Sequence, residues 1–298
     1  MTLHDHPARE RAAVVTALLA VQLFFGLHYL AAKLVLAEIP PRAWAAIRIG
    51  AAALILLALV RLVGRRLPTA RADLRRLAVY ALFGVVINQL CFVEGLKRTT
   101  PTHSALINTT IPVFSLLFAV FAGRERISGR KLLAVAVALA GVLLVIWPFG
   151  RTAFSSQTLA GDLLTLVNSM SFSLFLVISR DLLVRTDPLA ATAVLLGFGA
   201  LGILAVAWPA LLTFDPAPVS AGTWWLAAFV IVFATVLTYV LNYWALARVP
   251  SSVVALFIYV QPLIAATLSA ALFGERPAPR VLAGAALIFA GVFLALRR

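Results

Sequence analysis

Long, uninterrupted apolar runs constrain this chain more than any other feature of its sequence. A helix needs roughly 20 apolar residues to cross a bilayer, and runs of about that length recur from one end of the chain to the other. Because lipid satisfies no backbone hydrogen bond, only helices and closed barrels span a membrane. A barrel would alternate polar and apolar residues, and these runs do not alternate. The sequence therefore predicts an all-α polytopic membrane protein.

The composition excludes several other classes of protein. Of the 298 residues, 63% are hydrophobic and 12% are charged, whereas soluble chains are about a quarter charged. The net charge of +14 comes from basic residues scattered singly or in pairs between apolar runs. This pattern is typical of arginines that set membrane topology and not of a nucleic-acid-binding face. The single cysteine, Cys91, cannot form an internal disulfide.

The apolar runs predict ten membrane-spanning helices joined by short connections. With the N-terminus placed in the cytoplasm, 17 lysines and arginines flank the inward ends of these helices and 7 flank the outward ends. The positive-inside rule then places both termini in the cytoplasm. The predicted spans are 13–36, 43–63, 77–97, 102–122, 130–148, 160–180, 188–212, 223–247, 251–273 and 279–296.

The chain also aligns with itself after a shift of 150 residues, or 147 near the start of each half. The pairs that match include charged residues, prolines and glycines, which rarely keep one register by chance. The alignment predicts two repeats, at 13–148 and 160–296, and each contains five predicted spans. Because five is odd, the second repeat enters the membrane inverted, which is a transporter architecture with the substrate site between the repeats. The matched pairs include Phe25 with Phe172, Lys33 with Arg180, Pro112 with Pro262, Glu125 with Glu275, and Gly141 with Gly291.

Together these residues resemble the EamA-like branch of the drug/metabolite transporter superfamily. The resemblance rests on Phe24-Phe25-Gly26, Lys33, Pro40-Pro41, Arg48, Pro112, Glu125 and Gly141, and on Gly161-Asp162, Phe172, Arg180, Pro262, Glu275 and Gly291. It covers nearly the whole chain, and it implies ten helices in two EamA repeats and export of small metabolites such as amino acids or related compounds. One departure is Arg48, whose counterpart in the second repeat lies in the apolar region near Leu195.

Polar side chains inside predicted spans are candidates for the substrate pathway, because burying them in hydrocarbon is costly. Several recur at helical spacing beside aromatic residues, and an aromatic and amide lining suits a small polar or zwitterionic solute. The alternative for each of them is a hydrogen bond between neighbouring helices. The candidate binding residues are Gln22, Tyr29, Arg48, Asn88, Asn108, Asn168, Ser171, Thr235, Tyr239 and Asn242.

Arg48 is the one basic residue well inside a predicted span, and two interpretations of it remain open. It either binds a substrate carboxylate or has a structural role, reaching the membrane surface with its charge held over Trp44.

Three further residues are candidates for proton coupling. His28 and His103 are two of them, because histidine is the side chain whose ordinary charge change falls near neutral pH. Glu94 is the third, and its alternative role is pairing with Lys97 and Arg98 on the next helical turn.

The sequence therefore favours a secondary transporter that works by alternating access, with Pro112 and Pro262 as gating bends. No cofactor, no metal and no enzymatic activity are expected, and the expected partners are a small-molecule substrate and the lipid bilayer, with no nucleic acid. A small-solute channel or facilitator is the main alternative, and an integral-membrane lipid-modifying enzyme is a weaker one. The arginine-rich composition suggests a bacterial inner membrane. The sequence leaves the oligomeric state open, and a monomer is compatible with it.

Overall fold

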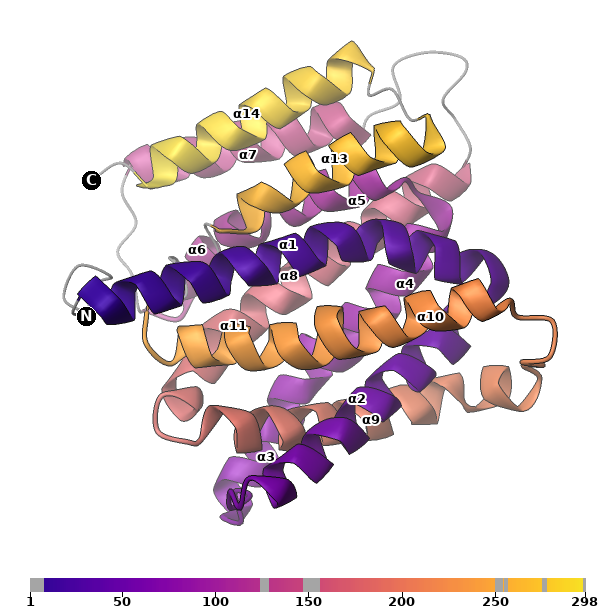
Figure 1. Ribbon diagram of the computed structural model, residues 1–298. Coiled ribbons are helices and arrows are strands. Elements are labelled where there is room, and N and C mark those ends of the chain that lie inside the picture. Colours follow the sequence, from indigo (N-terminus) through magenta and orange to yellow (C-terminus); the bar gives the residue numbers. More distant parts are fainter. Residues whose placement is uncertain are drawn as a thin grey trace.

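The computed structural model describes residues 8–123, 129–146, 156–249, 254, 257–274 and 278–296, and within them every regular element is a helix. Seven helical segments are long and apolar enough to cross a membrane (Figure 1). They are α1 (Ala8–Glu38), α2 (Pro41–Leu62), α3–η2–α4 (Arg71–Arg98), α5–α6 (Pro101–Phe121), α8 (Ser156–Leu183), α9 (Pro188–Leu212) and α10–η3–α11 (Ala221–Leu246).

The remaining helices are shorter: α7 (Gly129–Ile146), α13 (Val260–Phe273) with the preceding turn η4 (Phe257–Tyr259), and α14 (Pro279–Leu296). The seven long segments coincide with seven of the predicted spans. That the other three, at 130–148, 251–273 and 279–296, also cross the membrane stays a prediction. The repeat pair Glu125 and Glu275 lies outside the described residues.

Two π-helical turns occupy equivalent places in the chain. η2 (Leu82–Ile87) separates α3 (Arg71–Ala81) from α4 (Asn88–Arg98), and η3 (Val232–Leu237) separates α10 (Ala221–Ile231) from α11 (Thr238–Leu246). The two turns are 150 residues apart, which is the shift that aligns the sequence with itself. Since π-helices are rare and often lie at functional sites, this agreement indicates that the two parts share local structure as well as sequence pattern.

The fourth predicted span, at 102–122, is interrupted. α5 (Pro101–Asn108) is followed by a turn at Thr109 and Thr110, whose hydroxyls donate to the carbonyls of Leu106 and Ile107. α6 (Ile111–Phe121) then begins with Pro112 in its first turn, where the missing N–H of proline leaves no helical bond unmade. The segment 101–121 therefore forms one predicted span with a break at Thr109 and Thr110, just before Pro112.

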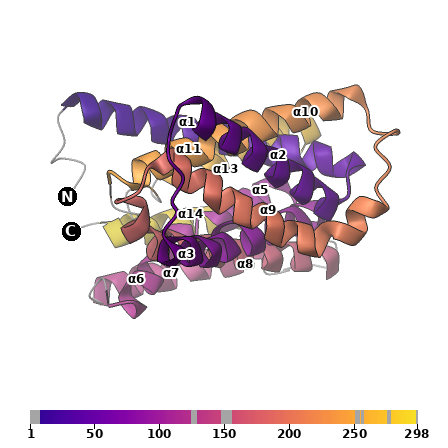
Figure 2. The same cartoon turned by 90° about the horizontal axis from the view of Figure 1, so that it is seen from below.

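The helices pack as two groups and two pairs. The first group, the α1 group, consists of α1 with α10, η3, α11 and α13, and the second, the α8 group, consists of α8 with η2, α4, α5 and α6. Figure 2 shows α1, α10 and α13 on one side of the molecule and α6 and α8 on the other. α2 packs along α9, and α7 packs along α14 at one edge of the molecule (Figure 1). Each repeat therefore contributes helices to both groups, and the two sequence halves interlock.

Candidate functional site

A cavity that encloses about 670 Å³ of empty space, part of it open to solvent, is lined by helices of both groups and by one residue of α2. Its wall combines aromatic rings, amides and a single guanidinium, which is the mixture typical of small-molecule sites. Among the described residues, no aspartate, glutamate or lysine belongs to this wall. The wall consists of Gln22, Phe25, His28, Tyr29, Arg48, Asn88, Gln89, Phe92, Asn108, Ile111, Asn168, Phe172, Leu176, Tyr239, Asn242, Val254, Ile258 and Gln261.

The structure brings eight of the ten candidate binding residues to this wall: Gln22, Tyr29, Arg48, Asn88, Asn108, Asn168, Tyr239 and Asn242. The other two, Ser171 and Thr235, lie outside the wall. The Ser171 hydroxyl donates to the carbonyl of Phe83 at 2.7 Å. Thr235 belongs to η3 and donates to the carbonyl of Val230, five residues back, at 2.9 Å. The wider π-turn thus turns Thr235 away from the face it would share with Tyr239 in an α-helix.

Sequence reasoning missed Gln89, Phe92 and Gln261, all of which lie on the wall. The internal repeat contained the signal for the first two. Gln89 and Phe92 stand 150 residues before the candidates Tyr239 and Asn242, so a position chosen in one repeat points to its counterpart in the other. Gln261 lies in a run that reads as apolar.

One chain of hydrogen bonds along the wall links α5, α1 and α13. The amide of Asn108 donates to the Tyr29 hydroxyl at 2.6 Å, and that hydroxyl donates to Gln261 Oε1 at 3.1 Å. Gln261 Nε2 in turn donates to Gln22 Oε1 at 2.5 Å. Ser169, behind Asn108 on α8, donates to its side-chain oxygen at 2.6 Å. The chain fixes the orientation of these amides at the contact between the α1 group and the α8 group.

A second set of hydrogen bonds is centred on Arg48. Its Nε donates to Thr235 Oγ1 at 2.7 Å, and its Nη1 donates to Gln89 Oε1 at 3.0 Å. Its Nη2 lies 3.4 Å from the carbonyl oxygen of Ala234. Gln89 then donates to the Tyr239 hydroxyl at 2.8 Å. Arg48 therefore connects α2 to η3 and to α4.

The interpretation in which Arg48 reaches the membrane surface is wrong. The residue is only 1% exposed. Its guanidinium contacts Thr235 and Gln89, and the cation–π contact found in the described part of the chain joins Arg248 to Trp244, not Arg48 to Trp44. The charge of Arg48 is held inside the protein because its hydrogen-bond acceptors lie there.

Only one of the three candidates for proton coupling is on the wall. The ring of His28 stacks on Phe92 with 5.0 Å between centroids, and its Nε2 is buried without a hydrogen-bond partner in the described structure. His103 instead lies 3.2 Å from Asp162, measured from Nδ1 to Oδ2.

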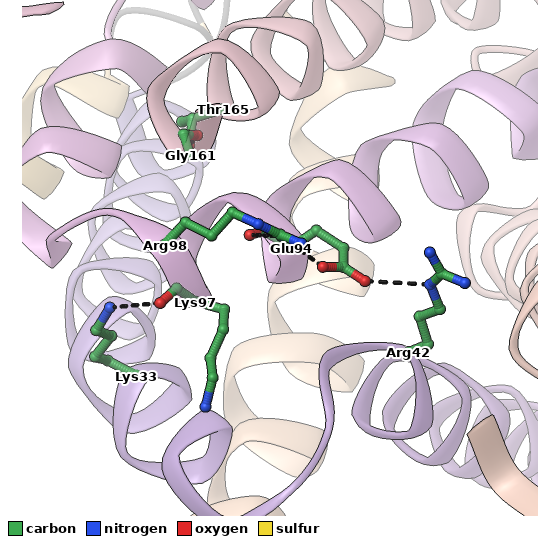
Figure 3. A network of polar contacts seen from close by, with 7 residues as sticks. All are labelled: Lys33, Arg42, Glu94, Lys97, Arg98, Gly161 and Thr165. Carbon is green, nitrogen blue, oxygen red and sulfur yellow. Dashed lines mark hydrogen bonds and ion pairs between the residues drawn. The ribbon is translucent and has the colours of Figure 1, made fainter. Parts of the chain in front are cut away.

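Glu94 lies away from the wall in a charged cluster. Its carboxylate pairs with Arg98 at 2.5 Å and with Arg42 at 3.2 Å (Figure 3). Pairing with Arg98 was the alternative role that the helical spacing suggests. Lys97 does not pair with Glu94, because the Lys97 ammonium donates to the carbonyl of Leu36 on α1.

Lys33 and Lys97 hold the ends of α1 and α4 together. Lys33 Nζ donates to the carbonyls of Leu96, Lys97 and Thr99 at 2.7, 3.2 and 2.6 Å, and the Lys33–Lys97 contact is drawn in Figure 3. Cations suit these sites because the last carbonyls of a helix lack partners within it. We name these three hydrogen bonds of Lys33 the Lys33 latch. It joins the α1 group to the α8 group at one end of the cavity, the Lys33 end.

Arg180, the repeat counterpart of Lys33, lies at the other end of the molecule. Asp162 is at the Lys33 end, since Thr99 donates to it at 2.5 Å. Arg180 is 18 residues further along α8, or about 27 Å at 1.5 Å per residue. Its Nε is buried with no hydrogen-bond partner among the residues that the structure describes. The two ends therefore differ, because Lys33 is bonded to carbonyls of the opposite group, whereas the Nε of Arg180 is bonded to none of the described residues.

Comparison with known proteins gives one family. The EamA-like transporter family matches residues 12–147 and again 159–297. The uncharacterized transporter YyaM of Bacillus subtilis is 28% identical over 288 residues, covering 93% of this chain and 92% of YyaM. The uncharacterized inner membrane transporter YedA of Escherichia coli K12 is 26% identical over 66% of this chain and 71% of its own. A protein of known crystal structure shares the fold at a TM-score of 0.65, with 20% identity over 96% of each chain.

Proposed function

The chain belongs to the EamA-like transporter family, and from this premise we propose that it is a secondary transporter that exports small metabolites, such as amino acids or related compounds, by alternating access. The observation that carries the proposal is the polar cavity between two helix groups, to which both repeats contribute. We place the protein in a bacterial inner membrane with both termini in the cytoplasm, supported by the arginine distribution and by the relative YedA.

The proposal includes ten membrane passes in two inverted repeats. The directions of α1 and α8, which are equivalent in the repeat, support the inversion. α1 ends at the Lys33 end, whereas α8 begins there with Asp162. Equivalent helices therefore run in opposite directions, as an odd number of spans in each repeat requires.

Because the sequence halves interlock, we propose that the moving units are the α1 group and the α8 group. In the structure described here the Lys33 latch joins the two groups at one end. In the alternative state, Arg180 would bind the last carbonyls of α11 as Lys33 binds those of α4. The exchange of one end contact for the other would let the cavity face each side of the membrane in turn.

Counterflow in proteoliposomes tests the proposal. Vesicles that hold the purified full chain are loaded with an unlabelled metabolite, and uptake of the same labelled metabolite is followed with and without a pH gradient. We expect saturable uptake that overshoots, because a carrier exchanges solutes across one alternating site. A channel or facilitator, the alternative left open by the sequence, would show neither saturation nor counterflow. A lipid-modifying enzyme has little support, because the relatives are named transporters.

The prolines give a further prediction about gating. Replacing Pro112 by alanine restores a backbone donor next to the break at Thr109 and Thr110, so that α5 and α6 can join into one helix. We expect about a tenfold slower counterflow together with a changed half-saturation constant, because hinge substitutions often alter both and because Asn108 and Ile111, on either side of the break, lie on the wall. The rate and the half-saturation constant are measured together, and Pro262→Ala in α13 is the matched variant in the second repeat. Unchanged rates in both variants would show that the two prolines have no role in gating.

A further inference from the structure

Arg48 is a buried positive charge at the edge of a cavity that offers it no negative partner. It is 1% exposed, and its three hydrogen bonds go to a hydroxyl, an amide oxygen and a backbone carbonyl, all of them neutral. No carboxylate contacts it in the described part of the chain. His28 is the one other titratable side chain on the wall apart from the two tyrosines. The cavity therefore has a fixed positive charge, and none of the described residues on its wall carries a negative charge to balance it.

This arrangement is costly unless a ligand completes it. Removing a charge from water requires a partner charge or a full set of hydrogen bonds, and charged groups inside membrane spans mark functional sites. A guanidinium has five N–H donors. The three observed bonds use one donor each on Nε, Nη1 and Nη2, which leaves one donor on each terminal nitrogen. Guanidinium donors on two nitrogens often bind the two oxygens of a carboxylate as a pair.

We propose that Arg48 binds the carboxylate of the transported solute, and that this carboxylate is the charge by which the cavity selects its substrates. The proposal rests on the proposed transport function and narrows its substrate class. No acidic side chain on the wall is available to a substrate ammonium group. An acid that lacks the amino group should therefore bind as well as the amino acid, whereas an amide that lacks the carboxylate should not.

The neighbours of Arg48 strengthen this assignment. Gln89 and Thr235 hold the guanidinium from two sides, so its orientation is set before a ligand arrives. Preorganisation of this kind lowers the cost of binding. The rings of Phe25, Phe92 and Phe172 form part of the same wall and would contact the apolar part of the solute.

The test measures ligand binding to the purified full chain by isothermal titration calorimetry. The probes are matched sets built on alanine, leucine and phenylalanine. Each set contains the amino acid, the acid without its amino group, and the amino acid amide. We expect at least one set in which both acids bind and the amide binds at least about 30-fold more weakly, the effect of removing one partner from a buried charge pair.

Variants separate the carboxylate role from a structural one. Arg48→Gln should weaken binding of the acids by at least about 30-fold while the ligand-free protein still elutes as one folded species. Arg48→Lys, which keeps the charge but not the planar fork, should fall in between. Arg61→Gln, at an exposed position of the same helix, should bind like the wild type.

Three results would overturn the proposal: amides that bind as well as the acids, acids that bind Arg48→Gln with unchanged affinity, or no binding by any acid in the panel. If Arg48→Gln does not fold, the comparison of acid with amide on the wild type decides alone. Counterflow reports on the proposed function separately. Transport of a solute without a carboxylate would support the transporter and refute this role of Arg48. Arg48-dependent binding without counterflow would support this role of Arg48 and refute the proposed transport.

Discussion

Replacing Lys33 by glutamate is expected to reduce counterflow to background and to leave the cavity reachable from the Lys33 end. The ammonium of Lys33 bonds three carbonyls at the end of α4, and a carboxylate at the same position would repel them. Hydrogen bonds to charged groups contribute about 1.5–3 kcal/mol each. A loss of about 3 kcal/mol from the latched state would change the ratio of the two states by roughly a hundredfold. The carrier would then remain in one state and could not complete its cycle.

Accessibility of a single cysteine measures this shift independently of transport. Ile258→Cys on the wall, in a chain that also carries Cys91→Ser, is labelled with a membrane-impermeant maleimide added to either side. Lys33→Glu should increase labelling from outside the cell, the side that the arginine distribution assigns to this end. Arg42→Gln is the control, because Arg42 lies at the same end in an exposed ion pair that contributes little. Normal transport and unchanged labelling in Lys33→Glu would refute the latch, and increased labelling from inside would reverse the orientation.

The equivalent change at the other end should have the opposite effect on accessibility. Arg180→Glu removes the residue proposed to close that end, and it does not touch the contacts of Lys33. We expect counterflow to stop while labelling from the Lys33 end falls. If Arg180→Glu and Lys33→Glu changed labelling from the same side, the two residues would not act as counterparts.

The general architecture was accessible from the sequence because hydrophobic length and the repeat are properties of the chain itself. A run of about 20 apolar residues predicts a helix across the membrane in any context, and seven long segments coincide with the predicted spans. The shift of 150 residues that aligns the two repeats also relates η2 to η3, a correspondence that the sequence predictions did not include. Most of the amides on the wall were found because polar residues in apolar runs are few.

What the sequence did not predict depends on backbone geometry and on contacts between distant helices. Thr235 has the spacing of a wall residue, but the π-turn at η3 changes that spacing. At the break just before Pro112, the hydroxyls of Thr109 and Thr110 bond the preceding carbonyls, and similar residues occur inside intact helices. The acceptors of Arg48 lie 41 and 187 residues away. No local pattern distinguishes a side chain held in this way from one that reaches the surface.

The close approach of α4 and α8 leads to the prediction with the largest expected effect on folding. A Cβ atom placed on Gly95 would lie 2.9 Å from the carbonyl oxygen of Gly161 and 2.9 Å from Thr165 Oγ1, and one placed on Gly161 would lie 2.9 Å from Arg98 Cβ. Figure 3 shows Gly161 and Thr165 on the helix above α4. Small residues let helix backbones approach in membranes, and at this contact the carbonyl oxygen of each glycine lies within 3 Å of the Cβ position of the other.

Gly95→Leu is therefore expected to prevent accumulation of folded protein. The side chain would push α8 away from α4, and it would break the contact in which Asn168 donates to the carbonyl of Asn88 at 2.9 Å on the cavity wall. Overpacking costs about 1–3 kcal/mol even for small additions, and a whole leucine side chain against backbone adds more. Fluorescence-detected size-exclusion chromatography of detergent extracts measures the folded fraction. Gly50→Leu and Gly197→Leu are the matched controls, because nothing lies within 4 Å of a Cβ at either site, and both should accumulate normally. Wild-type levels of Gly95→Leu would mean that α4 and α8 do not pack as closely as the structure has them.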